Sequence, residues 1–182
     1  MSDARLLHSQ PVHAGKIVDL RLDRVELPNG QVAELEVIRH VGAAAVVPLD
    51  ANGEVVLVRQ YRYAVGDWLL EVPAGKLDAG ENPAVCVRRE LEEETGLSAG
   101  SLESLDWIYT TPGFTDEKIW LFLARDLQPA EQRLEEDEVL EVVRMPLAEA
   151  LERARDGRIH DGKSVCCLLR AAARLGLTEA PD

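Results

Sequence analysis

The segment Gly75 to Leu97, which reads GKLDAGENPAVCVRRELEEETGL, decides the fold. Asn82 has the side chain of a helix N-cap, and Pro83 after it suits the first helical position. Gly96 is placed to end the helix in the left-handed conformation that glycine adopts without strain. The segment therefore predicts a helix from Pro83 to Thr95, preceded by a loop.

This predicted helix carries carboxylates beside its apolar face. At about 100° per residue, one face collects the apolar residues and packs on a sheet: Ala84, Val87 and Leu91. Glu90, Glu93 and Glu94, at positions i, i+3 and i+4, fall on an adjoining arc, where their charges repel one another. A bound cation would offset that repulsion, and oxygen ligands without histidine or cysteine favour Mg²⁺ or Mn²⁺.

Glu81, in the loop before the helix, is a further candidate ligand. Spacing alone leaves a second interpretation open, in which the glutamates only solvate a surface helix and Arg89 forms an ordinary i, i+4 pair with Glu93.

The rest of the chain alternates strands with a few helices. Pro28-Asn29-Gly30 and Asp50-Ala51-Asn52-Gly53 predict two hairpin turns. The predicted strands are 17–27, 32–39, 43–49, 54–62, 102–110, 119–125 and 139–145, and helices are predicted at 147–156 and 163–175. This order predicts an α+β fold, an α/β/α sandwich with a mixed sheet, in residues 41–182, and an antiparallel β ribbon in residues 1–40.

Composition restricts the partners. The 33 acidic and 20 basic residues give a net charge of −13, which argues against nucleic acid or an anionic membrane as the partner. The N-terminal residues lack the layout of a signal peptide, and the apolar runs are too short to cross a bilayer. Cys86, Cys166 and Cys167 show no metal-ligand pattern and are expected to be free thiols in the cytoplasm.

The whole segment resembles the Nudix box at every defined position. It has a glycine, five residues, Glu81, seven residues, Arg89-Glu90-aliphatic, one residue, Glu93-Glu94, one residue, and Gly96-aliphatic. The resemblance implies the Nudix fold and hydrolysis of a nucleoside diphosphate linked to another moiety, with Mg²⁺ or Mn²⁺ as cofactor. It implies metal ligands and catalytic roles as follows: Glu90, Glu93 and Glu94 bind metal, Glu81 assists, the backbone carbonyl of Ala74 is a ligand, Arg89 orients the glutamates, and Glu93 and Arg89 count as catalytic.

Outside the box, residues 17 to 151 are most similar to ADP-ribose pyrophosphatases. That subfamily has a proline about fifteen residues beyond the box, and Pro112 fills that place here. It also has an arginine for the diphosphate, at Arg62, and a glutamate of a late acidic loop that activates water. Glu138 is the first choice for that base and Glu136 the second, although an acidic run is often only solvated.

The resemblance also implies an adenine site between the N-terminal ribbon and a second subunit, hence a homodimer. We assign these residues to substrate binding: Arg62, Ile17, Thr111, Gly113 and Glu117. The ribbon contains neither Trp nor Phe, so it lacks the usual stacking partner for a base.

The expected activity is cleavage of ADP-ribose to AMP and ribose 5-phosphate. The alternatives are another diphosphate, such as a nucleotide sugar or a dinucleotide, a nucleotide-binding regulator without turnover, and an acidic scaffold.

Overall fold

A computed structural model describes residues 3–136 and 138–177. The chain divides into two units. One contains the residues up to Gly42 together with Tyr109–Lys118, and the other contains Ala43–Ile108 and the residues from Ile119 onward. The expected ranges 1–40 and 41–182 thus meet close to this boundary, and their residues 1–2, 137 and 178–182 lie outside the described part.

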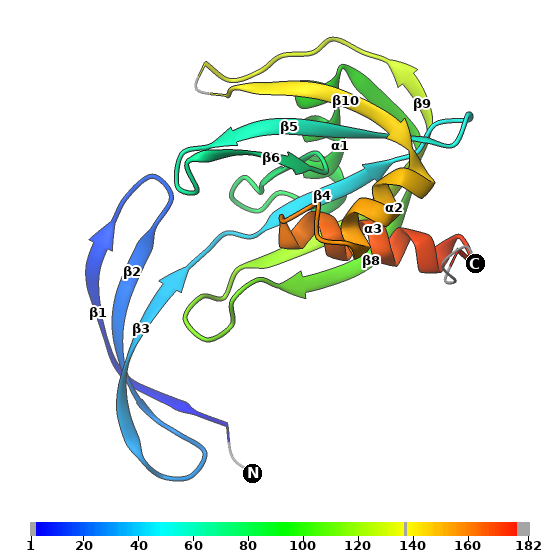
Figure 1. Ribbon diagram of the computed structural model, residues 1–182. Coiled ribbons are helices and arrows are strands. Elements are labelled where there is room, and N and C mark those ends of the chain that lie inside the picture. The colour runs from blue at the N-terminus through cyan, green and yellow to red at the C-terminus, as the bar shows by residue number, and fades with distance from the viewer. Residues whose placement is uncertain (1–2, 137, 178–182) are drawn as a thin grey trace. The chain divides into compact units, whose positions relative to one another are not determined.

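The first unit is built on a three-stranded antiparallel sheet in the order β1-β2-β3 (Figure 1). Its strands are β1 (Arg5–Ala14), β2 (Asp19–Glu26) and β3 (Val32–Arg39). The predicted hairpin is confirmed, since β2 pairs with β3 around a turn in which Gly30 has a φ of 80°. The strand β1 was not predicted, because nearly all of its residues are exposed and it lacks the alternation of a half-buried strand.

Arg39 connects β3 to the loop Tyr109–Lys118 within this unit. Its guanidinium donates to the buried carboxylate of Asp23 at 2.7 Å and to Asp116 at 3.2 Å. The backbone N–H of Ile38 donates to the carbonyl of Phe114 at 2.8 Å. The loop is therefore fixed to the edge of the ribbon by an ion-pair network as well as by backbone hydrogen bonds.

The second unit contains two sheets and three helices (Figure 1). The four-stranded sheet has the order β7 (Ala74–Lys76), β4 (Ala43–Pro48), β9 (Lys118–Pro129) and β8 (Leu97–Tyr109), and it is mixed because β4 runs parallel to β9 and antiparallel to β7. The three-stranded sheet has the order β10 (Leu140–Pro146), β5 (Glu54–Arg62) and β6 (Asp67–Glu71), all antiparallel. The helices are α1 (Pro83–Thr95), α2 (Leu147–Arg155) and α3 (Gly162–Arg174).

The buried strands β4 and β5 distribute their side chains between two apolar clusters. Val46 of β4 and Val56 of β5 pack in the cluster that contains Val87 and Leu91 of α1. Their neighbours along each strand point the other way, into a cluster with α2 and α3. Helix α1 thus contacts both sheets, and the predicted α+β fold with a mixed sheet and helices on its faces is confirmed.

The second predicted turn is confirmed, since the N–H of Gly53 donates to the carbonyl of Asp50 at 3.2 Å and Leu49 forms an antiparallel bridge with Val55. The hairpin does not continue beyond this bridge, because β4 and β5 then enter different sheets. Both strands are buried on both faces, so their sequence does not reveal which neighbour each one pairs with. Strands β6 and β7 were not predicted either. In the described residues, none of the helices has the length and apolar character needed to cross a bilayer.

Candidate active site

Helix α1 begins and ends where the sequence predicts. The side chain of Asn82 accepts a hydrogen bond from the N–H of Ala84 at 2.8 Å, and Pro83 occupies the first turn. Gly96 ends the helix with a φ of 66°, and its N–H donates to the carbonyl of Glu92. These two caps fix which residues of the helix face the sheets.

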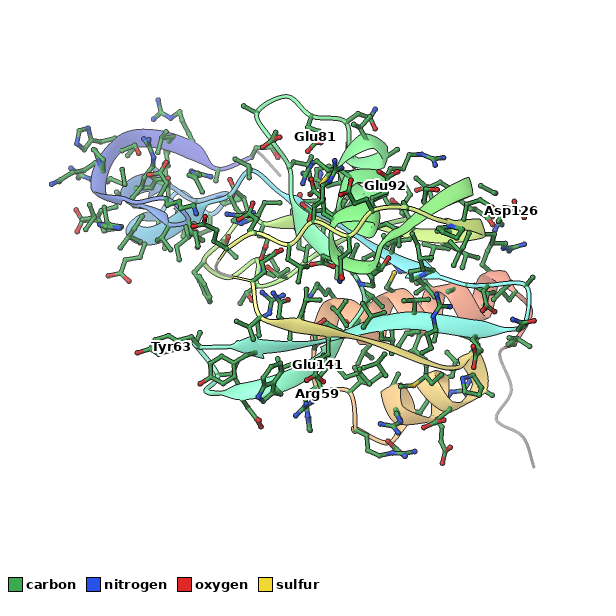
Figure 2. All side chains as sticks on the ribbon, turned by 90° about the horizontal axis from the view of Figure 1, so that it is seen from above. Arg59, Tyr63, Glu81, Glu92, Asp126 and Glu141 are labelled. Carbon is green, nitrogen blue, oxygen red and sulfur yellow. The ribbon has the colours of Figure 1, made fainter. Side chains whose placement is uncertain are left out.

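The glutamates of α1 lie partly inside the protein. Glu94 is 2% exposed and Glu90 is 8% exposed, whereas Glu93 is half-buried. Figure 2 shows Glu92 on α1 and Glu81 in the loop that leads into it. A helix with buried acids beside its apolar face is not an ordinary solvated helix, because charged carboxylates are rarely buried without a partner.

Arg89 holds most of these carboxylates together. Its guanidinium donates to Glu90 at 2.7 Å, to Glu93 at 3.1 Å and to Glu81 at 3.2 Å. It also donates to the carbonyl of Lys76 at 3.2 Å. One planar cation therefore orients three acids and the loop backbone.

The short strand β7 forms the wall beside these acids. The N–H of Ala74 donates to the carboxylate of Glu94 at 3.1 Å. Gly75 lies directly against the carboxylate of Glu90, which would overlap a Cβ atom at that position. A glycine at position 75 is thus required for the close approach of Glu90 to the backbone.

Burial and repulsion both act on the buried acids. Burial, together with the charges of Glu90 and Glu138, raises the pKa of Glu94 to about 8. Burial also raises the pKa of Glu90, against the influence of Arg89. The charge of Glu138 thus contributes to the raised pKa of both buried acids. The carboxylate of Glu138 accepts from the N–H of Glu135 at 3.0 Å, while Glu136 is exposed and Asp137 lies outside the described residues.

The carboxylates of α1 and its loop are ligands of the kind that a hard divalent cation prefers. The donors are all oxygens, and the buried Glu94 has like charges around it that a cation would offset. In the arrangement described, Arg89 binds Glu90 and Glu93, and over residues 3–136 and 138–177 no three acidic, histidine or cysteine side chains are gathered tightly enough to hold an ion.

Arg62 lies at the end of β5 and is held by a buried acid. Its guanidinium forms two hydrogen bonds with Glu71, at 2.8 and 2.7 Å, and Glu71 is only 1% exposed. Lys163 of α3 also contacts Glu71 and pairs with Asp161 at 3.0 Å. The charge of Glu94 contributes to the raised pKa of Arg62, so this cation lies within the field of the α1 acids.

Sequence reasoning missed Glu71 and Lys163. A single acid inside the apolar run Trp68 to Val72 was a usable signal for Glu71, because a lone buried charge needs a partner. Lys163 gave no local signal, since it reaches Glu71 from an element 92 residues away in the sequence.

The remaining predicted substrate residues belong to the first unit. Ile17 is 60% exposed, in the turn between β1 and β2. Thr111, Gly113 and Glu117 lie in the loop after β8. Glu117 accepts from the hydroxyl of Thr110 at 2.8 Å.

Comparison with known proteins shows the family of this chain. Residues 39–165 match the sequence model of the NUDIX domain. The chain belongs to the Nudix family. Residues 5–38 match a second model, described as the nucleoside diphosphate sugar hydrolase N-terminal domain. As a Nudix enzyme the chain is a pyrophosphohydrolase, and three of its box glutamates, Glu81, Glu90 and Glu93, are bonded to Arg89.

Relatives of this Nudix protein align with it over nearly their whole length. It is 41% identical to the methanol dehydrogenase activator of Bacillus methanolicus, over 90% of this chain and 89% of that one. It is 38% identical to the ADP-ribose pyrophosphatase of Bacillus subtilis (strain 168), over 89% of each chain. The crystal structure of an ADP compounds hydrolase matches with a TM-score of 0.84 and 25% identity, over 97% of this chain and 96% of that one.

Proposed function

We propose that this protein hydrolyses ADP-ribose to AMP and ribose 5-phosphate. The observation that carries the proposal is the group of acids on α1 and its loop, in which Arg89 holds three carboxylates and the buried Glu94 accepts a hydrogen bond from the N–H of Ala74. A relative that is 38% identical over 89% of this chain is named an ADP-ribose pyrophosphatase, which supports the same substrate here.

The proposed metal ligands are the acids of α1 and its loop: Glu90, Glu93, Glu94 and Glu81, with the backbone carbonyl of Ala74. All offer hard oxygen donors suited to Mg²⁺ or Mn²⁺. A divalent ion supplies neutralisation of the diphosphate charge and a lower pKa for a bound water. Release of Glu90 and Glu93 from Arg89 frees their carboxylates for this role, and Arg89 continues to fix Glu81.

The other residues of the chain bind substrate and move a proton. Arg62, fixed by its two bonds to Glu71, offers its remaining N–H groups to the diphosphate. Glu138 accepts a proton from the attacking water, and Glu136 is the second choice for that base. Glu138 is preferred because its charge contributes to the raised pKa of both Glu90 and Glu94, which supports a place for it beside the proposed metal ligands.

We further propose a homodimer in which the ribbon of the first unit binds adenine, with Ile17, Thr111, Gly113 and Glu117 near the substrate. Several apolar side chains of the ribbon are exposed in the single chain, including Leu6, Val12 and Val32, and a partner subunit would cover them. The cytoplasm is the proposed location, because all three cysteines are free thiols.

A second candidate substrate is a nucleoside diphosphate sugar. It is favoured by one observation, the match of residues 5–38 to a domain named for hydrolases of such sugars. Both candidates share the diphosphate, so the α1 acids and Arg62 would act alike on either.

A substrate panel separates the candidates. Purified protein with Mg²⁺ is given ADP-ribose, a nucleotide sugar such as GDP-mannose, and a dinucleotide, and the products are identified by chromatography. We expect the highest kcat/KM for ADP-ribose, with equal amounts of AMP and ribose 5-phosphate. Faster turnover of the nucleotide sugar would make that compound, and not ADP-ribose, the substrate. No turnover of any compound would overturn the proposed enzyme activity.

A further inference from the structure

Gln60 is a buried polar residue that the site described so far does not use. It lies on β5, two residues before Arg62, and is 6% exposed. Its amide oxygen Oε1 is fully buried and has no hydrogen-bond partner among the described residues. A buried polar group without a partner destabilises the folded protein, so its presence in a packed strand calls for a ligand that satisfies it.

The pairing of β5 shows which way Gln60 points. Side chains alternate along a strand, and those directly opposite each other in an antiparallel pair share a face. Arg59 pairs with Glu141 at 3.3 Å on the side of the sheet away from α1 (Figure 2). Val56 packs with the residues of α1. Gln60 therefore points toward α1, as Arg62 does.

The same register brings Gln60 near the proposed base. Leu140 of β10 is opposite Gln60, and the carbonyl of Val139 accepts from the N–H of Tyr61 at 3.1 Å, which extends the pairing by one residue. Glu138 follows in that direction, so it is the diagonal neighbour of Gln60 on the α1 side. Diagonal neighbours across an antiparallel pair lie about 7 to 8 Å apart, a separation that a water held between two side chains can bridge.

We propose that Gln60 is a positioning residue for the attacking water, which it holds together with Glu138. This rests on the proposed function. One water proton is directed at the carboxylate of Glu138 and the other at Oε1 of Gln60, which leaves a lone pair of the water oxygen aimed at phosphorus. A bond forms between this oxygen and phosphorus while the bond from phosphorus to the bridging oxygen breaks, and the bridging oxygen leaves with the electron pair as part of the other phosphate. The first proton passes to Glu138, and the second stays on the new phosphate oxygen.

The test is the replacement Gln60→Met, which keeps the length of the side chain and removes the amide. If Gln60 positions water, kcat falls by about tenfold or more, while KM stays within about twofold. The melting temperature does not fall, because an unpartnered buried amide has been exchanged for an apolar group. The control is Gln128→Met, at an exposed position of β9, which leaves kcat, KM and melting temperature unchanged.

A double substitution with Glu138→Gln adds a second readout. If both residues act on one water, the losses in kcat combine to much less than their product. Independent, multiplying losses would overturn the proposal. So would an unchanged kcat in Gln60→Met, a rise in KM alone, which indicates binding of the diphosphate instead, or a clearly lower melting temperature, which indicates a structural partner.

The same experiment separates the two proposals. A wild-type protein inactive on the whole substrate panel overturns the proposed function and this inference with it. An active wild type with an equally active Gln60→Met variant overturns this inference alone.

Discussion

Gly75 allows the carboxylate of Glu90 to lie against the backbone of β7. In Gly75→Ala the new methyl group would displace that carboxylate, which is the free end of a flexible side chain and can swing away at small cost. We therefore expect a melting temperature within a few degrees of wild type and a fall in kcat/KM of about tenfold or more.

Gly162→Ala is the matched control for Gly75→Ala, because no atom lies near the added methyl group at that position. Melting curves and initial rates on both variants test the account. Equal activity in the two alanine variants would show that the position of Glu90 against β7 has no part in turnover.

Glu71 is the second residue on which the site depends. Burial favours its neutral form, but the hydrogen bond from Arg62 and the charge of Lys163 outweigh burial and lower the pKa of Glu71. A carboxylate with a lowered pKa in the folded state stabilises the protein at pH above its unfolded value, and this contribution is lost as pH falls through the folded value.

We expect Glu71→Gln to lower the free energy of unfolding by about 3 kcal/mol at pH 7, since two cations lose their charged partner. The difference from wild type should narrow below about pH 4, because the unfolded wild-type chain takes up a proton at Glu71 there, whereas the folded protein does so only at lower pH. Urea unfolding of both proteins from pH 7 to pH 3 measures this difference in the free energy of unfolding. A difference that stays constant down to pH 3 would contradict the ion-pair account.

Single residues were predictable from sequence where their partners are close in the chain. Glu90, Glu93, Glu94 and Arg89 share one helix, so a fixed spacing identifies them. Gln60 gave no such signal, because its importance comes from burial next to β10, which only the pairing of distant strands reveals.

Helix α1 determines where the acids point, and replacing its N-cap residue tests how much the cap stabilises the helix. Asn82→Ala removes the bond to the N–H of Ala84, and loss of such a cap costs about 1 kcal/mol. Urea unfolding should show this loss, while kcat/KM of the folded protein stays within about twofold because the side chain of Asn82 bonds to the helix backbone and not to a proposed ligand. A large fall in turnover with unchanged stability would mean that Asn82 acts in the site itself.

The elements themselves were predicted unevenly. The caps of α1 and the β2–β3 turn were readable because Asn82, Gly96 and Gly30 act on their immediate neighbours. The pairing of β4 and β5 was not, because continuous apolar runs fit any buried strand position. Their assignment to two sheets depends on β9 and β10, more than 70 residues away.

The whole molecule is acidic, with a net charge of −13, yet the proposed substrate is an anion. In the proposed function, Arg62 and a divalent ion on the α1 acids would supply the positive charge that binds the diphosphate. The sequence predicted a ribbon apart from the main domain. It did not predict that Tyr109–Lys118 joins the ribbon, since that contact depends on Ile38 and Arg39 meeting a loop about 75 residues later.

The measurement that tests the central claim most directly is AMP release from ADP-ribose, with Mg²⁺ varied, by wild type, Glu90→Gln and Glu92→Gln. The last is the matched control, on the same helix (Figure 2), whereas the hydrogen bonds of Arg89 go to Glu90, Glu93 and Glu81. We expect Glu90→Gln to lose at least about a hundredfold in kcat/KM, because a lost metal ligand removes several kcal/mol of charge stabilisation. Glu92→Gln should match wild type, and chelation of Mg²⁺ should abolish turnover in all three. Wild-type rates in Glu90→Gln, or turnover that persists after chelation, would contradict a metal site on α1.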